Sequence, residues 1–200
     1  DYLDPFLLLD HFGSEDPDDY RAGFPWHPHR GIETVTYMLA GEVDHRDSIG
    51  NAGTIGPGDV QWMTAGGGIM HEEMPAPVDG RMYGFQLWVN LPARLKMMQP
   101  RYQEIAANQI REARREDGSC IRVIAGRVET RQDAVQGPVT DIAADPTYLD
   151  VTLPAGGLFE HPIPRGHTAF AYPFEGAGAF VGIEQPEAYA EAIIEYLKRP

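Results

Sequence analysis

Cysteine is nearly absent from this 200-residue sequence, which contains Cys120 alone. One cysteine cannot form an internal disulfide or supply a cluster of thiolate ligands, so any metal site must consist of histidine and carboxylate side chains. Low cysteine usage is typical of a reducing compartment, and we therefore expect a cytoplasmic location.

The sequence also lacks a long apolar run and has few cations. No stretch approaches the roughly 18 apolar residues of a membrane span, which predicts no membrane partner. Thirty acidic residues outnumber 16 basic ones, for a formal charge of −14. This charge repels a phosphate backbone, so nucleic acid is not expected as a direct partner. An acidic surface is compatible with a basic partner protein.

Glycine and proline are plentiful, with 22 and 17 residues, and they separate short runs rich in β-branched and aromatic residues. That rhythm is typical of small antiparallel barrels. We predict an all-β fold of two antiparallel β-barrels followed by a C-terminal α-helix. The predicted segments are an N-terminal barrel over 1–100, a linker with a short helix over 101–118, a second barrel over 119–183, and an amphipathic helix over 184–200.

The segment PWHPHRGIE places His27 and His29 two residues apart. In an extended chain both imidazoles project from the same face, and Glu33 has the same parity. Two ligands could therefore converge on one point. The pair alone is a weak signal, because solvated histidines beside a proline turn account for it equally well.

A second pair, His71 and Glu73, follows the glycine run 66–68, which allows tight backbone turns. Three imidazole nitrogens and one carboxylate oxygen could surround a single divalent ion and leave coordination positions open. Mixed ligation of this kind is typical of non-haem iron, so we predict one iron ion per chain. Because imidazole also suits nickel, copper, manganese and zinc, those metals stay open.

Three longer stretches carry a family resemblance: LDPFLLLDHF, HPHRGIETVTYMLAGE and GPGDVQWMTAGGGIMHEEMP. They resemble the pirin family of the cupin superfamily, in its bacterial form. The resemblance implies that His27, His29, His71 and Glu73 are the metal ligands and that Glu33 is not one. It also implies a second barrel without metal, and the histidines there lack the paired spacing.

Pirins with quercetinase activity imply a function for this chain: a metal-dependent dioxygenase that opens the heterocyclic ring of a flavonol such as quercetin, with O2 as co-substrate. Glu73 would be the candidate catalytic base. The alternative implied by other pirins is a non-enzymatic, redox-sensing regulatory protein that binds a partner protein. The resemblance further implies that segments before LDPF and within the second barrel are missing from this sequence.

Candidates for the wall of a substrate pocket are Trp26, Met70 and Arg30, which are nearest in sequence to the expected ligands. Aromatic and thioether side chains hold flat apolar ligands, and a guanidinium group could anchor a carboxylate. Core packing for Trp26 and Met70, or a surface ion pair for Arg30, would explain them equally well. His45, among charged turn residues, is expected to be solvated.

Overall fold

The computed structural model describes residues 3–76, 80–130 and 133–178. The chain divides into two compact units, Asp1–His161 and Pro162–Pro200. The first unit contains all the named strands, and the described part of the second, residues 162–178, contains no helix or strand. The predicted C-terminal helix over 184–200 lies outside the described residues.

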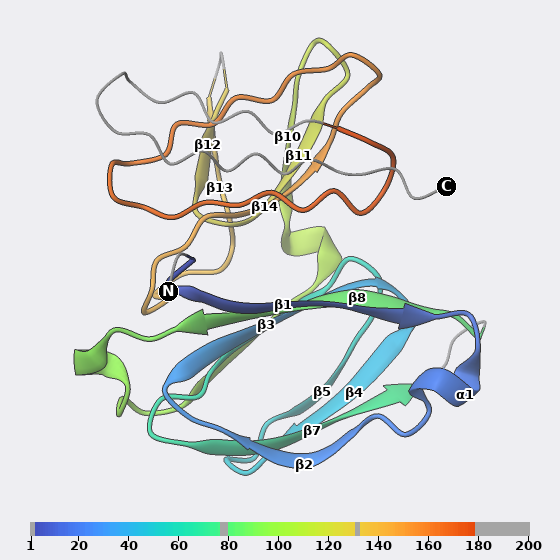
Figure 1. The fold of residues 1–200 in the computed structure, drawn as a ribbon, viewed down its shortest axis with the longest axis vertical. Coiled ribbons are helices and arrows are strands. Elements are labelled where there is room, and N and C mark those ends of the chain that lie inside the picture. Colours follow the sequence, from blue (N-terminus) through green and yellow to red (C-terminus); the bar gives the residue numbers. More distant parts are fainter. Residues whose placement is uncertain (1–2, 77–79, 131–132, 179–200) are drawn as a thin grey trace. The chain divides into compact units, whose positions relative to one another are not determined.

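Two sheets face one another in the N-terminal part of the first unit (Figure 1). One sheet has the strand order β1-β8-β3-β6-β9. Its strands are β1 (Phe6–Ser14), β8 (Met82–Asn90), β3 (Ile32–Ala40), β6 (Val60–Thr64) and β9 (Arg101–Ile105). The other sheet has the order β2-β7-β4-β5. Its strands are β2 (Phe24–His29), β7 (Ile69–Ala76), β4 (Glu42–Asp47) and β5 (Ala52–Ile55).

The core between these sheets draws on both of them. Met38 and Met82 from the first sheet pack with Val43 and Ile55 from the second, and all four are at most 5% exposed. Val43 alternates with more exposed residues along β4, as expected for a strand that buries one face, whereas β3 around Met38 is buried along most of its length. This apolar packing holds the inner faces of the two sheets together.

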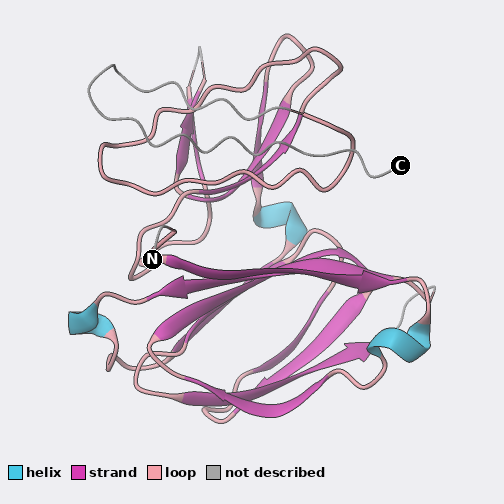
Figure 2. Cartoon of the chain, viewed as in Figure 1, coloured by secondary structure: helices cyan, strands magenta, loops and turns pink. Residues whose placement is uncertain are grey.

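A second β region follows in the same unit (Figure 2). Its sheets have the orders β10-β11-β14 and β12-β13. Their strands are β10 (Arg111–Arg114), β11 (Cys120–Ala125), β14 (Tyr148–Thr152), β12 (Arg127–Glu129) and β13 (Ala134–Gln136). Ala113, Ile121, Val123 and Val128 form a separate buried cluster, so this region has a core of its own.

Helical structure is scarce in the described residues. It consists of α1 (Pro17–Tyr20) and two 3-10 turns, η1 (Ala93–Leu95) and η2 (Ala107–Gln109). Among the described residues, no helix is long and apolar enough to cross a membrane.

The all-β prediction is confirmed, since every named strand pair is antiparallel. Within the described ranges, however, no strand pairing joins the two N-terminal sheets into a closed barrel. The expected linker 101–118 instead contains β9, η2 and β10, and β9 pairs with β6. Its polar composition reflects strands with an exposed face. The barrel limits at 100 and 118–119 otherwise stay a prediction.

The turn between β6 and β7 depends on Gly66. Its φ of +51° lies in the left-handed region, and an added Cβ would collide with the carbonyl oxygen of Met98. That oxygen already accepts a hydrogen bond of 2.9 Å from the Gly67 N–H. The backbone has no room to move away without losing this bond.

We expect Gly66→Ala to lower the free energy of unfolding by about 3 kcal/mol, since backbone strain and the collision add together. Gly156→Ala is the matched control, because Gly156 also has a positive φ, of +76°, but meets nothing within 4 Å of an added Cβ. This control should lose only about 1 kcal/mol. Urea denaturation of both variants measures the difference, and equal losses would contradict a steric role for Gly66.

Candidate metal centre

Three histidines meet on the inner face of the β2–β7 pair. In the antiparallel register, His27 lies directly opposite His71, and His29 follows two residues along β2. Residues that are opposite or two apart share a face of the sheet. Strand geometry alone therefore sends the three imidazoles into the same interior space.

The three rings lie in mutual contact. Their centroids are 4.3 Å apart for His27 and His71 and 4.9 Å apart for His29 with each of the other two. One ring nitrogen from each histidine lies within 4.8 Å of the other two, and the Nε2 atoms of His27 and His29 are 3.1 Å apart. Nitrogens this close can share one cation of suitable size.

Neighbouring groups orient the rings. The Nδ1–H of His27 donates to the carbonyl oxygen of Pro25 at 2.9 Å, which leaves Nε2 of His27 as the free lone pair. His71 has its Nδ1 3.4 Å from Nδ1 of His45, while its Nε2 is buried with no hydrogen-bond partner among the described residues. A buried nitrogen without a partner is costly unless something binds it. A metal ion fits that requirement.

Burial keeps two of the imidazoles uncharged. Loss of solvation, helped by His27, lowers the pKa of His29 from 6.5 to about 4. The same cause, with contributions from His27, His29 and His45, lowers the pKa of His71 to about 3. Both rings are therefore neutral at physiological pH, which is the form that binds metal.

Glu73 lies on β7 two residues beyond His71 and is 5% exposed. Its Oε1 accepts a hydrogen bond from Thr36 Oγ1 at 3.1 Å, and its Oε2 accepts one from Gln86 Nε2 at 2.9 Å. Burial raises the pKa of the Glu73 carboxyl, and these two donors oppose the rise. Its carboxylate is outside the group of mutually close histidine nitrogens, so its assignment as the fourth ligand stays a prediction.

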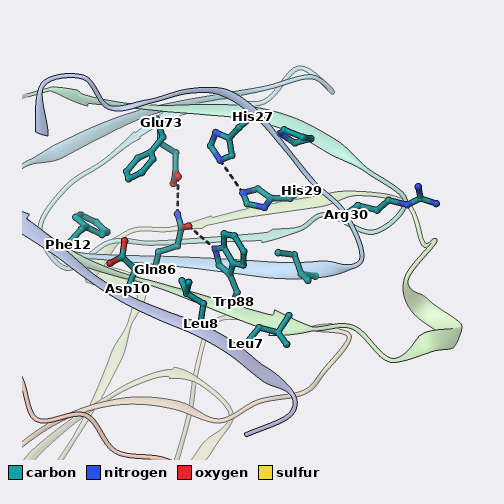
Figure 3. Close-up of a pocket in the computed structure, with 13 residues that line it drawn as sticks. Leu7, Leu8, Asp10, Phe12, His27, His29, Arg30, Glu73, Gln86 and Trp88 are labelled. Carbon is teal, nitrogen blue, oxygen red and sulfur yellow. Dashed lines mark hydrogen bonds between the residues drawn. The ribbon is translucent and has the colours of Figure 1, made fainter. Parts of the chain in front are cut away.

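A cavity of about 530 Å³ opens onto this cluster (Figure 3). His27, His29 and Glu73 border it together with Gln86. Most of the remaining wall is apolar and comes from β1, β2, β3 and β8: Leu7, Leu8, Phe12, Phe24, Pro28, Ile32 and Trp88. The Trp88 ring meets His29 edge to face, with centroids 5.1 Å apart. Polar groups at one end and apolar walls elsewhere are typical of a small-molecule site.

One of the three predicted pocket residues borders the cavity. Arg30 does so and donates to Met97 Sδ at 3.2 Å. Trp26 and Met70 do not, and these residues are 48% and 46% exposed. Each directly precedes an inward-facing histidine, so strand alternation turns it to the outer face. The expectation that these two line the pocket was wrong.

Glu33 does not share the face of the histidine pair. Gly31, at φ +70°, turns the chain between β2 and β3 and ends the parity predicted from an extended segment. The Glu33 carboxylate instead accepts hydrogen bonds from Thr64 Oγ1 at 2.8 Å and from the Ala143 N–H at 3.3 Å. Burial raises its pKa. Glu33 is not among the residues of the histidine cluster.

His45 was expected to be solvated and is instead 1% exposed. Its ring stacks on Tyr102 with a centroid separation of 5.0 Å and borders His71. The signal was available in β4, where Val43, His45 and Asp47 alternate with exposed residues. Charged neighbours in sequence hid that alternation.

Two facing antiparallel sheets with a histidine cluster between them are typical of proteins of the cupin type. Similar sequences then identify the family within this class. Residues 1–89 match the family model Pirin. "Pirin-like protein" of Caulobacter vibrioides is 52% identical over 174 residues, which are 87% of this chain and 62% of the relative. "Putative quercetin 2,3-dioxygenase Ta0133" of Thermoplasma acidophilum is 41% identical over 83% of this chain and 69% of the relative. This chain belongs to the pirin family.

Solved structures agree with that assignment. GK1651 from Geobacillus kaustophilus is 46% identical with a TM-score of 0.58, covering 70% of this chain and 52% of the other. Quercetin 2,3-dioxygenase from Acinetobacter baumannii is 44% identical with a TM-score of 0.57, covering 70% and 49%. The chain spans about three-fifths of the length of the Caulobacter relative.

The lowered histidine pKa values predict how the metal-free protein responds to acid. The unfolded chain binds protons at these two sites below pH 6.5, whereas folded His29 and His71 stay neutral until about pH 4 and 3. Stability therefore falls as the pH drops below 6.5. We expect a loss on the order of 2 kcal/mol between pH 6.5 and 5 from chemical denaturation of the chelator-treated protein. A His29→Gln, His71→Gln variant should lose much less stability over this range. An equal loss would show that these two histidines do not cause the acid sensitivity.

Proposed function

We propose that this chain binds one divalent metal ion, iron, through His27, His29, His71 and Glu73. The buried, unpartnered Nε2 of His71 beside two converging imidazoles is the observation that carries the proposal. Imidazole with one carboxylate, and no thiolate, favours iron over a closed structural zinc site. Nickel, copper, manganese and zinc bind the same ligand types, so metal analysis must separate them.

We further propose a pirin-type dioxygenase that acts on a flavonol such as quercetin, with O2 as the second substrate. Relatives whose names contain quercetin 2,3-dioxygenase support this reaction, as does the cavity beside the cluster. The bound metal would supply Lewis acidity toward the substrate oxygens and the means to reduce O2.

The protein's own residues would bind, orient and deprotonate the substrate. The apolar walls, including Trp88 and Phe24, suit a flat aromatic molecule and exclude water from the reacting end. Glu73 borders the cavity, so its carboxylate is placed to accept the proton of a substrate hydroxyl. The proton would move from the hydroxyl oxygen to a carboxylate oxygen of Glu73.

The first test combines metal analysis by mass spectrometry with oxygen uptake in the presence of quercetin. We expect about one iron per chain in the wild type, and loss of both metal and uptake in a His27→Ala, His29→Ala variant. The matched control is His161→Ala, His167→Ala, which removes two histidines outside the cluster and should keep both properties. Bound metal without uptake in the wild type would favour a redox-sensing regulatory protein that binds a partner protein.

A second test addresses the two roles proposed for Glu73, metal ligand and base. We expect Glu73→Gln to lower kcat by about 100-fold or more, because the amide cannot take up the hydroxyl proton. Steady-state oxygen uptake at saturating quercetin measures this, with metal content determined on the same sample. A variant that kept its metal and full turnover would remove the catalytic role of Glu73.

A further inference from the structure

A chain of hydrogen bonds joins the pocket wall to the Glu73 carboxylate (Figure 3). Trp88 Nε1–H donates to Gln86 Oε1 at 2.8 Å, and Gln86 Nε2 donates to Glu73 Oε2 at 2.9 Å. Thr36 Oγ1 donates to the other carboxylate oxygen at 3.1 Å. Both oxygens of Glu73 therefore receive a hydrogen bond from the opposite sheet.

The indole sets the direction of the Gln86 amide. An indole N–H can only donate, so Gln86 must turn its oxygen toward Trp88 and its NH2 group toward Glu73. The reverse orientation would place two donors against each other and the amide oxygen against the carboxylate. Trp88 thus selects the one orientation of Gln86 that stabilises an ionised Glu73.

Strand register places these groups where they act. Gln86 and Thr36 are opposite one another on β8 and β3, whereas Glu73 lies on β7 of the facing sheet. Trp88 also meets His29 edge to face and borders the cavity. The Trp88 indole therefore contacts His29, lines the cavity and bonds Gln86, which in turn bonds the Glu73 carboxylate.

We propose that Gln86, oriented by Trp88, is a positioning residue that aims the Glu73 carboxylate at the ion held by the three histidines. This role rests on the metal site proposed above. Thr36 holds one oxygen, and Gln86 holds the other and sets the rotation of the carboxylate. A pocket ligand that contacts Trp88 would act on Glu73 through the same amide.

The first test uses Co²⁺ as the probe, because its visible absorption reports coordination without turnover. Gln86→Met keeps the length of the side chain and removes both amide groups. We expect Co²⁺ affinity, measured by competition with a chelator, to fall about 10- to 100-fold. The Co²⁺ spectrum should shift toward that of Glu73→Gln. Gln103→Met is the matched control, since the Gln103 side-chain amide donates to the Thr140 carbonyl oxygen at 3.1 Å and not to Glu73, and it should keep wild-type affinity and spectrum.

A double-mutant cycle tests whether Trp88 acts through Gln86. Trp88→Phe keeps an aromatic ring but removes the N–H, so it should weaken Co²⁺ binding several-fold in the wild-type background. In the Gln86→Met background the same change should have little further effect, because the amide that it orients is already gone. Circular dichroism on each protein checks that the fold is retained.

Three results would overturn this inference: wild-type Co²⁺ affinity and spectrum in Gln86→Met, equal losses from Trp88→Phe in both backgrounds, or a loss in Gln103→Met as large as in Gln86→Met. If Gln86→Met fails to fold, Trp88→Phe with wild-type affinity is sufficient to reject it. The dioxygenase proposal fails separately, when wild-type protein binds metal at the histidines and consumes no oxygen with quercetin.

Discussion

The antiparallel register of β2 and β7 is the constraint on which the candidate site depends. It sets His27 opposite His71, and the two-residue period of each strand then brings His29 and Glu73 onto the same inner face. A shift of one residue in β2 would turn His27 and His29 outward, away from His71 and Glu73 on β7. The histidine pair and the glutamate are distant in sequence, so only this pairing joins them.

The register also imposes an energetic problem, because it buries polar groups in a mostly apolar interior. The imidazoles respond by remaining neutral, as the lowered pKa values of His29 and His71 show. Glu73 has a different solution, since two donors on the facing sheet satisfy its oxygens. What stays unsatisfied among the described groups of the cluster is the Nε2 of His71, whose ring contacts the other two imidazoles. The buried nitrogen that lacks a partner therefore belongs to the same cluster that could hold a metal ion.

The cavity extends the same arrangement toward a small molecule. Its polar end is formed by side chains whose positions are set by cross-strand bonds, while its apolar wall includes Leu7, Leu8 and Phe12 of the N-terminal strand β1. β1 belongs to the sheet that faces the histidine strands. The pocket thus draws on both sheets, whereas the three histidines all lie on β2 and β7. The core of Met38, Val43, Ile55 and Met82 packs these two sheets together. The distance between the two sheets at the proposed flavonol site would depend on this packing.

Local pattern was enough to predict several features. Alternation and glycine or proline breaks indicated an all-β chain, and the pairs at 27/29 and 71/73 picked out the histidines that the structure brings together. Alternation also explains the errors. Trp26 and Met70 were chosen by nearness in sequence, although the residue next to an inward ligand points outward, and Glu33 was assigned a parity that the turn at Gly31 interrupts.

The sequence by itself determined the strand character, the types of ligand available and the family, because these depend on local residue order and composition. Only the tertiary structure decided that His45 is buried behind His71, that Glu33 bonds elsewhere, and that Gln86 and Trp88 support Glu73. Each of these contacts crosses between strands or sheets that are far apart in the chain. Their partners are chosen by register and by sheet packing, and neither can be read from a single strand.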